Sequence, residues 1–237
     1  MMRPAFLQML AAGLALSATV SAQTPPPQKA RSVTVYSKVS YLAFLPKSYS
    51  AKGQPVPLII FLHGSGERGS DLSKVKAWGP PAIAEKDPAF PFMVVSPQTP
   101  DGEWWHARLL KGMIDEVLAK YNVDRSRVYL TGLSMGGYGA WDLAINYPNY
   151  FAAIAPICGG GNTLRIGQLK NVPTWAFHGK KDQSVPERES AAMVAALRAA
   201  GGDVKYTVLP EAGHVDAWVH AYGEAGLFDW FLEHRKR

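Results

Sequence analysis

The chain has 237 residues, of which 47% are apolar and 19% are charged. This composition excludes an intrinsically disordered protein and is sufficient for a single domain with a sizeable core. The formal net charge of +6 is not concentrated in a basic block, so the charge pattern does not indicate a nucleic-acid partner.

The N-terminus carries the pattern of an export signal. Arg3 is followed by an apolar stretch over about residues 6–20, and residues 20–22 (Val-Ser-Ala) are the small residues that a signal peptidase prefers. Because this stretch is short for a transmembrane helix, we predict a signal peptide over residues 1–22, cleaved after Ala22, rather than an uncleaved membrane anchor. Residues 23–32 contain three consecutive prolines and are predicted to be a linker. Residues 33–237 are then predicted to form one domain of a periplasmic or secreted protein.

Short apolar runs alternate with amphipathic runs after the linker. Strands are predicted over about residues 33–36, 40–45, 57–62, 92–95, 127–131, 151–157, 173–177 and 204–209, and helices over about 105–120, 138–147, 187–199 and 217–234. The alternation predicts an α/β fold with a mostly parallel, doubly wound sheet and helices on both faces. Only about fifteen residues separate the strands at 151–157 and 173–177, so no cap domain is predicted.

The sequence Gly132-Leu133-Ser134-Met135-Gly136 lies between a predicted strand and a predicted helix. It matches the G-x-S-x-G nucleophile elbow of the α/β-hydrolase fold, in which a sharp turn presents a serine hydroxyl above the sheet. Glycines flank the serine because the strand and the helix approach each other too closely for a Cβ atom. The pattern alone also fits a glycine-rich helix start that is capped by a serine. The prediction of Ser134 as a nucleophile therefore needs the rest of a catalytic triad.

A serine nucleophile requires an imidazole base that a carboxylate orients, and in this fold the acid precedes the histidine along the chain. Asp182 lies in the loop after the strand at 173–177, where such an acid is expected, whereas the glutamates that follow it fit the first turn of the next helix. His214 lies in the loop after the last predicted strand, and His220 falls inside the last predicted helix. We therefore predict a triad of Ser134, Asp182 and His214.

Acyl transfer also requires an oxyanion hole, in which two backbone N–H groups bind the carbonyl oxygen as it gains charge. The first N–H is predicted to come from Met135, the residue after the nucleophile. The second is predicted to come from the glycine-rich loop at 63–69, with Ser65 as the first choice and Gly66 as the alternative. His63 begins this loop and is predicted to anchor it by a hydrogen bond.

Three tryptophans are candidates for substrate binding. Trp104 and Trp105 follow the strand at 92–95, and Trp218 is close to His214 in the chain. The alternative is that these rings only pack in the core. No spacing of histidines, cysteines or carboxylates resembles a zinc or iron motif, so neither a metal nor a cofactor is predicted. Cys158 is the only cysteine and is predicted to be a buried, unreactive thiol.

Residues 62–69, 132–139 and 156–161 together resemble the small α/β-hydrolases of the dienelactone-hydrolase and prolyl-oligopeptidase-like group. That group includes carboxylesterases, feruloyl esterases and phospholipase/carboxylesterase relatives, and the resemblance extends over about residues 40–232. It implies the same triad as above and does not fix the substrate. Two features depart from the group. First, dienelactone hydrolases proper use a cysteine nucleophile, so Ser134 argues against that activity. Second, one residue more than usual separates His214 from the next aromatic residue, Trp218.

The sequence thus predicts an exported serine carboxylesterase whose partner is a small-molecule or plant-derived ester, with short-chain acyl and feruloyl-type esters as candidates. Two alternatives stay open. One is a serine peptidase of the prolyl-oligopeptidase-like group, because the triad does not separate ester from amide cleavage. The other is a hydrolase-like binding protein without turnover, against which an intact triad argues.

Overall fold

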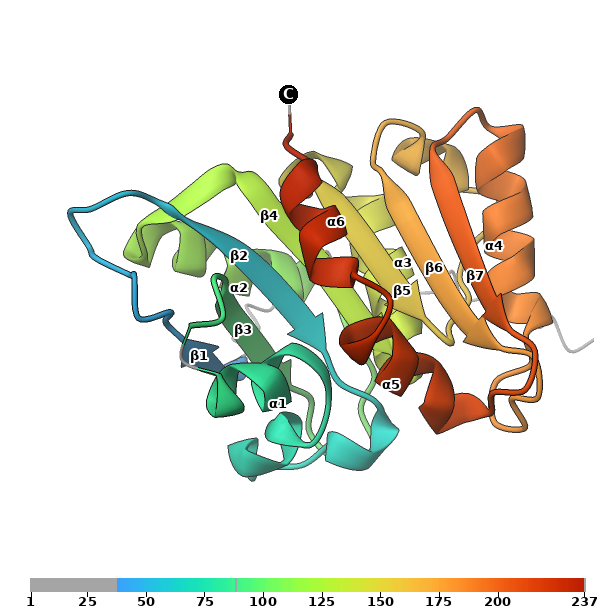
Figure 1. Ribbon diagram of the computed structural model, residues 1–237, viewed down its shortest axis with the longest axis horizontal. Coiled ribbons are helices and arrows are strands. Elements are labelled where there is room, and N and C mark those ends of the chain that lie inside the picture. The colour runs from blue at the N-terminus through green and yellow to red at the C-terminus, as the bar shows by residue number, and fades with distance from the viewer. Residues whose placement is uncertain (1–37, 88, 237) are drawn as a thin grey trace, which may run out of the picture. The chain divides into compact units, whose positions relative to one another are not determined.

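A seven-stranded sheet forms the centre of the part of the chain that the computed structural model describes, residues 38–87 and 89–236 (Figure 1). Its strands have the order β1-β3-β2-β4-β5-β6-β7. Their bounds are β1 Ser40–Phe44, β2 Val56–Leu62, β3 Met93–Gln98, β4 Val123–Leu133, β5 Ala153–Ile157, β6 Thr174–Gly179 and β7 Val204–Leu209. β1 pairs antiparallel with β3, and all other neighbours are parallel. The predicted mostly parallel sheet is confirmed.

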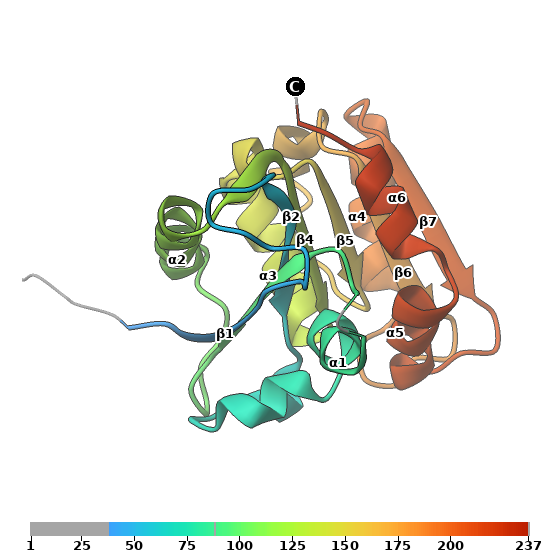
Figure 2. The ribbon, with the colours of Figure 1, turned by 60° about the vertical axis from the view of Figure 1, so that its left-hand side comes forward.

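Helices cover both faces of this sheet, as Figures 1 and 2 show. One face carries α1 (Gly79–Lys86), α5 (His214–Gly223) and α6 (Leu227–Glu233), and the other carries α2 (Ala107–Lys120), α3 (Met135–Asn146) and α4 (Arg188–Ala199). The doubly wound arrangement is therefore confirmed as well. In such a sheet, loops at the carboxyl ends of the parallel strands meet at one edge, where ligands bind.

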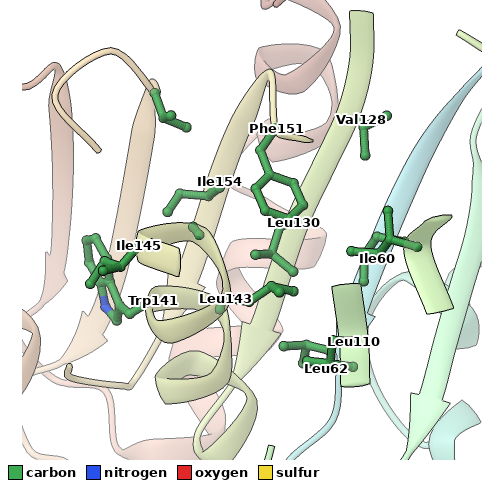
Figure 3. Close-up of a cluster of buried hydrophobic side chains, with 14 of the residues drawn as sticks. Ile60, Leu62, Leu110, Val128, Leu130, Trp141, Leu143, Ile145, Phe151 and Ile154 are labelled. Atoms are coloured by element: carbon green, nitrogen blue, oxygen red, sulfur yellow. The ribbon is translucent and has the colours of Figure 1, made fainter. Parts of the chain in front are cut away.

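Strand β2 shows how the sheet separates two apolar layers. Leu58, Ile60 and Leu62 belong to a cluster with side chains of α2, α3 and α4, part of which Figure 3 shows. Ile59 and Phe61 belong to the cluster below α1, α5 and α6. All seven residues of β2 are buried, and full burial of such a side chain stabilises the fold by about 1.5–3 kcal/mol. The centre of the sheet is thus a rigid support for the loops at its edge.

The connection between β5 and β6 is short, as predicted. Residues 158–173, all of which the structure describes, form only one 3-10 helix, Ile166–Leu169. The prediction that no cap domain is inserted here is confirmed. In the described part of the chain, no helix has the length and the apolar character needed to cross a membrane. The predicted signal peptide, linker and strand at 33–36 lie outside the described residues and stay predictions.

The C-terminal helix prediction is wrong in its extent. The sequence indicates one helix over about residues 217–234, but the structure contains α5 and α6. Gly226, with φ of 71°, adopts the left-handed conformation between them, which interrupts the helix. Helix α5 also begins earlier, at His214, because the Asp216 carboxylate accepts a hydrogen bond from the Gly213 N–H at 2.8 Å. Helix α1 was not predicted, because its first turn contains the consecutive residues Pro80 and Pro81, which occupy positions where no N–H is needed.

Asp124 in β4 connects the C-terminal segment to the sheet. Its carboxylate accepts hydrogen bonds from the Ser126 hydroxyl and the Arg127 guanidinium, both at 2.6 Å, and from Arg235 at 3.1 Å. Burial alone would raise the pKa of Asp124, but these hydrogen bonds and the Arg127 charge outweigh it and lower the pKa to about 2.

We expect Asp124→Asn to reduce the free energy of unfolding by roughly 1 kcal/mol at pH 7, a value discounted for solvent screening. Because the native pKa lies below the ordinary value of 3.8, the stabilisation is complete above that value and is lost as the pH falls through about 2. Urea unfolding of both proteins at pH 7 and pH 3 should therefore show a smaller difference at pH 3. An equal difference at both pH values would contradict the role of the ionised carboxylate.

Candidate active site

Ser134 lies in the sharp turn between β4 and α3. Its φ of 54° and ψ of −118° fall in a region that residues other than glycine rarely adopt. Close packing maintains this conformation, because a Cβ atom on Gly132 would overlap the carbonyl oxygen of Gly136, and one on Gly136 would overlap the carbonyl oxygen of Leu62 in β2. The Ser134 N–H also donates to the Ile157 carbonyl at 2.9 Å. The serine hydroxyl is thus presented at the carboxyl edge of the sheet.

The loops after β6 and β7 lie side by side because hydrogen bonds continue beyond the paired strands. The Lys180 N–H donates to the Leu209 carbonyl and the Lys181 N–H to the Ala212 carbonyl, both at 2.9 Å. Asp182 follows directly in the first loop, and His214 follows the second. The parallel pairing of β6 with β7 therefore brings these two side chains within reach of each other.

His214 lies between the other two residues of the predicted triad. Its Nε2 is 2.9 Å from the Ser134 hydroxyl, and its Nδ1 is 2.5 Å from Oδ2 of Asp182. A carboxylate only accepts hydrogen bonds, so Nδ1 carries a hydrogen and Nε2 is free to accept the serine proton. The structure thus brings Ser134, His214 and Asp182 into one hydrogen-bonded row.

Asp182 is 8% exposed but stays ionised. Burial alone would raise its pKa, yet hydrogen bonds from the Val185 N–H, the His214 ring and the Ser184 N–H outweigh burial, and the pKa is lowered. The two N–H groups donate to Oδ1 at 2.9 and 2.8 Å. A negative charge beside Nδ1 favours the imidazolium that His214 would become on accepting a proton.

Met135 and Ser65 each occupy the first position of a helical segment. Met135 begins α3, and Ser65 begins a 3-10 helix, Ser65–Glu67. N–H groups at such positions have no acceptor within their own helix. The two segments are close, because a Cβ atom on Gly64 would lie 2.9 Å from the side chain of Leu133. Arg68 further restrains the loop through a hydrogen bond of 3.0 Å from Nε to the Ser65 carbonyl.

His63 is buried at the start of this loop and does not join the triad. Its Nδ1–H donates to the Gly64 carbonyl at 2.5 Å, and its Nε2 accepts from the Thr99 N–H at 3.2 Å. Burial, assisted by the charge of Arg68 and opposed by the bond to Gly64, lowers the pKa of His63 to about 4. Trp105 donates from its indole nitrogen to the His63 carbonyl at 3.2 Å. A neutral imidazole thus joins the loop to the end of β3.

The three predicted tryptophans lie in different surroundings. Trp218 is 6% exposed, and its ring meets the His214 ring edge-on at 4.9 Å. Since α5 begins at His214, the four-residue spacing brings Trp218 back over the imidazole despite the extra residue in this segment. Trp105 is 5% exposed and packs against His63. Trp104 is 51% exposed and contacts Tyr138, one turn after the nucleophile, at 6.1 Å between ring centroids.

Sequence reasoning did not assign a role to Tyr138 or to His178. Tyr138 stands four residues after Ser134, a helical spacing that could have placed it beside the nucleophile. His178 is completely buried, and its Nε2 lies 3.3 Å from Oδ2 of Asp182. The four-residue spacing from His178 to Asp182 gives a weak signal, because the contact depends on how the loop turns after β6.

One group of potential metal ligands occurs within the described ranges: Cys158, His178 and Asp182, whose donor atoms lie within 4.8 Å of one another. Burial and the charge of Asp182 raise the pKa of the Cys158 thiol, which therefore keeps its proton. Nε2 of His178 donates to the Val185 carbonyl at 2.9 Å. In the metal-free protein these three side chains therefore form part of a buried polar cluster around Asp182.

Residues 37–221 match the profile of the Dienelactone hydrolase family. The chain belongs to this family. The resemblance inferred from the three sequence stretches is thereby confirmed. Unlike dienelactone hydrolases proper, this family member places a serine in the elbow.

Individual relatives of this family member carry esterase and depolymerase names. The chain is 32% identical over 121 residues to the Poly(3-hydroxyalkanoate) depolymerase C of Paucimonas lemoignei, which is 44% of this chain and 28% of that protein. It is 30% identical over 131 residues to Feruloyl esterase B of Neurospora crassa, 49% of this chain and 43% of that protein. The crystal structure of a thermostable esterase matches with a TM-score of 0.76 and 32% identity, covering 83% of this chain and 59% of that chain. The chain thus spans less than two thirds of each of these proteins.

The close packing at the elbow of this dienelactone hydrolase family member predicts the effect of adding one methyl group. Gly136→Ala should reduce the free energy of unfolding by about 3–5 kcal/mol or prevent folding, because the new Cβ would overlap the backbone of β2. Gly112→Ala is the matched control, since nothing lies within 4 Å of its Cβ position in α2, and it should change stability by no more than about 1 kcal/mol. Thermal unfolding followed by circular dichroism measures both. A Gly136→Ala protein as stable as the wild type would refute the packing argument.

Proposed function

We propose that this chain is a serine hydrolase that cleaves carboxylic esters through an acyl-enzyme intermediate. The observation that carries the proposal is the position of His214, with Nε2 2.9 Å from the Ser134 hydroxyl and Nδ1 2.5 Å from Asp182. These distances are within the range of a working nucleophile–base pair and its orienting acid. Membership of the family and the esterase names among the relatives support hydrolysis as the reaction class.

Acylation begins when His214 Nε2 accepts the proton of the Ser134 hydroxyl as Oγ attacks the ester carbonyl carbon. Asp182 stabilises the imidazolium that forms. The carbonyl oxygen becomes an oxyanion and accepts hydrogen bonds from the N–H groups of Met135 and Ser65, with Gly66 as the alternative donor. Loss of one such donor typically lowers the rate by about 10²–10³. The bond to the alcohol oxygen then breaks, and the alcohol leaves with the proton from His214.

Deacylation repeats these steps with water as the nucleophile. His214 accepts a proton from water as the oxygen attacks the acyl carbon, and the same N–H groups bind the second oxyanion. Breakdown of this intermediate returns the proton to Ser134 Oγ and releases the carboxylic acid. The cycle restores the enzyme and consumes one water for each ester, without a metal or cofactor.

The exposed ring of Trp104 beside Tyr138 is the proposed contact for the acyl group. These rings suit a flat aryl acyl group, such as a hydroxycinnamate, or a short aliphatic chain. The feruloyl esterase among the relatives supports the first choice. Trp105 and Trp218 are almost fully buried, so their proposed contribution to binding is to hold His63 and His214 in place.

Ser134→Ala should reduce kcat for p-nitrophenyl butyrate by roughly 10⁴-fold or more, because the variant lacks the nucleophile. A fluorophosphonate should label the wild-type protein at Ser134 and leave the variant unlabelled, as seen by peptide mass spectrometry. The control is Ser50→Ala, at an exposed serine outside the site, which should keep full activity.

Assays of p-nitrophenyl acetate and of the p-nitroanilide of butyric acid, run beside the butyrate ester, separate three results. Faster turnover of the ester than of the matched anilide supports an esterase, and the reverse supports a serine peptidase. A folded wild-type protein that leaves both the acetate and the butyrate ester untouched, and is not labelled, would show a binding protein without turnover.

We also propose that the protein is exported and that Ala22 is the last residue removed. The support is the charged, apolar and small-residue pattern at the N-terminus. Expression of the full chain in a bacterium should give a periplasmic or secreted form that begins at Gln23, measured by intact mass and N-terminal sequencing. Exported material that still begins at Met1 would contradict the proposed cleavage.

A further inference from the structure

A second histidine contacts the carboxylate that orients His214. His178 ends β6 and is completely buried. Its Nε2 lies 2.9 Å from the Val185 carbonyl and 3.3 Å from Oδ2 of Asp182. A carbonyl oxygen only accepts hydrogen bonds, so Nε2 carries a hydrogen and donates it to Val185, and Oδ2 of Asp182 lies beside the same N–H group.

The other ring nitrogen of His178 continues a buried row of hydrogen bonds. Nδ1 lies 2.7 Å from the Ser190 hydroxyl, which lies 2.8 Å from the Gly159 carbonyl. Ser190 is a buried residue of α4, and Gly159 lies in the loop after β5. The row therefore joins the loop after β5, through α4 and His178, to the loop that carries Asp182.

Hydrogen bonds restrain both ends of the turn at 182–185, which begins with Asp182. Oδ1 of Asp182 accepts from the N–H groups of Ser184 and Val185, while Oδ2 receives His214 and faces His178. The N–H of Val185 thus donates to the Asp182 carboxylate. The carbonyl of the same residue accepts from His178, whose ring lies beside that carboxylate. Rotation of the Asp182 side chain would break several of these contacts together.

We propose that His178 is a positioning residue for ester hydrolysis: its Nε2–H binds the Val185 carbonyl beside Oδ2 of Asp182 and restrains the turn at 182–185, which keeps Oδ2 aimed at Nδ1 of His214. This inference rests on the proposed function of the triad. His178 itself touches neither the nucleophile nor the substrate. Its effect is on the orientation of the base, where small displacements lower the rate strongly.

Among the residues that the structure describes, Cys158 and Glu187 are further titratable groups near His178. Cys158 lies at the end of β5, and burial raises the pKa of its thiol, so it adds no charge. Glu187 precedes α4, and its carboxylate is held by the Tyr206 hydroxyl at 2.6 Å and by Lys180 at 2.9 Å. These hydrogen bonds lower the pKa of Glu187, so its charge is constant near neutral pH.

His178→Leu should lower kcat for p-nitrophenyl butyrate by about 10- to 100-fold, with KM changed by less than about twofold. His178→Gln retains an N–H donor and should recover part of the loss. The acid limb of the kcat/KM profile of His178→Leu should move to higher pH, because Oδ2 of Asp182 loses the polar N–H group beside it and favours the protonated form of His214 more strongly. His220→Gln is the matched control, since the side chain of that partly exposed histidine bonds to Glu224, the residue after α5.

A second measurement does not depend on turnover. The Nδ1 proton of His214, in its short bond to Asp182, should give a low-field proton NMR signal in the free wild-type protein. We expect this signal to shift or broaden in His178→Leu and to stay nearer the wild-type position in His178→Gln. If the wild type fails to hydrolyse esters, the proposed function fails, while this signal still reports whether His178 orders Asp182.

Should His178→Leu fail to fold, the proposal is tested by kcat, the pH profile and the low-field signal of His178→Gln and Ser190→Ala. Ser190→Ala removes the partner of Nδ1 and should lower kcat by about threefold to tenfold with the same direction of NMR shift. Folded variants of His178 that keep the wild-type kcat, pH profile and low-field signal would overturn the proposal. A fall in thermal stability without change in those three readouts would likewise show that His178 only supports the fold.

Discussion

The backbone of helix α3 begins so close to β2 that only glycine fits at the contact, and the site depends on this approach. At Gly136 the space of a side chain is occupied by the Leu62 carbonyl, so neither segment can move independently of the other. The contact holds Ser134 at a φ of 54°, a conformation that the turn would not keep alone. It also places the Met135 N–H at the start of a helix, where it has no internal acceptor. The position of the nucleophile is thus a consequence of packing against a fully buried strand.

Asp182 brings a negative charge into direct contact with the base, His214. Asp182 is buried and ionised because several donors face its oxygens, whereas burial keeps His63 uncharged with a pKa near 4 and raises the pKa of the Cys158 thiol. The uncharged His63 ring instead holds its loop in place through two hydrogen bonds, to Gly64 and Thr99. The negative charge of Asp182 lies directly beside the imidazole, with Oδ2 2.5 Å from Nδ1 of His214. In a low-dielectric interior, the interaction between Asp182 and His214, which orients the base, is stronger than it would be in water.

The sequence predicts those parts of the fold that local patterns determine. Continuous apolar runs identified the central strands, and the glycines around Ser134 identified the elbow, because each feature is a pattern within a few consecutive residues. The break at Gly226 was missed because an isolated glycine is tolerated inside a helix, and only its left-handed conformation here interrupts one. The contacts of His178 could not be predicted either. Its partners Ser190 and Gly159 belong to α4 and to the loop after β5, so their meeting depends on the assembled sheet.

The short connection after β5 bears on how a substrate would be selected. An enclosed site restricts both halves of an ester, whereas residues 158–173 supply only one 3-10 helix. Under the proposed function, an uncovered site limits the size of the departing alcohol weakly, and discrimination falls to the surface that meets the acyl group. The exposed face of Trp104, supported by Tyr138, is such a surface. An aromatic platform gains contact area with flat acyl groups at little conformational cost. Selectivity should therefore follow the shape of the acid more closely than that of the alcohol.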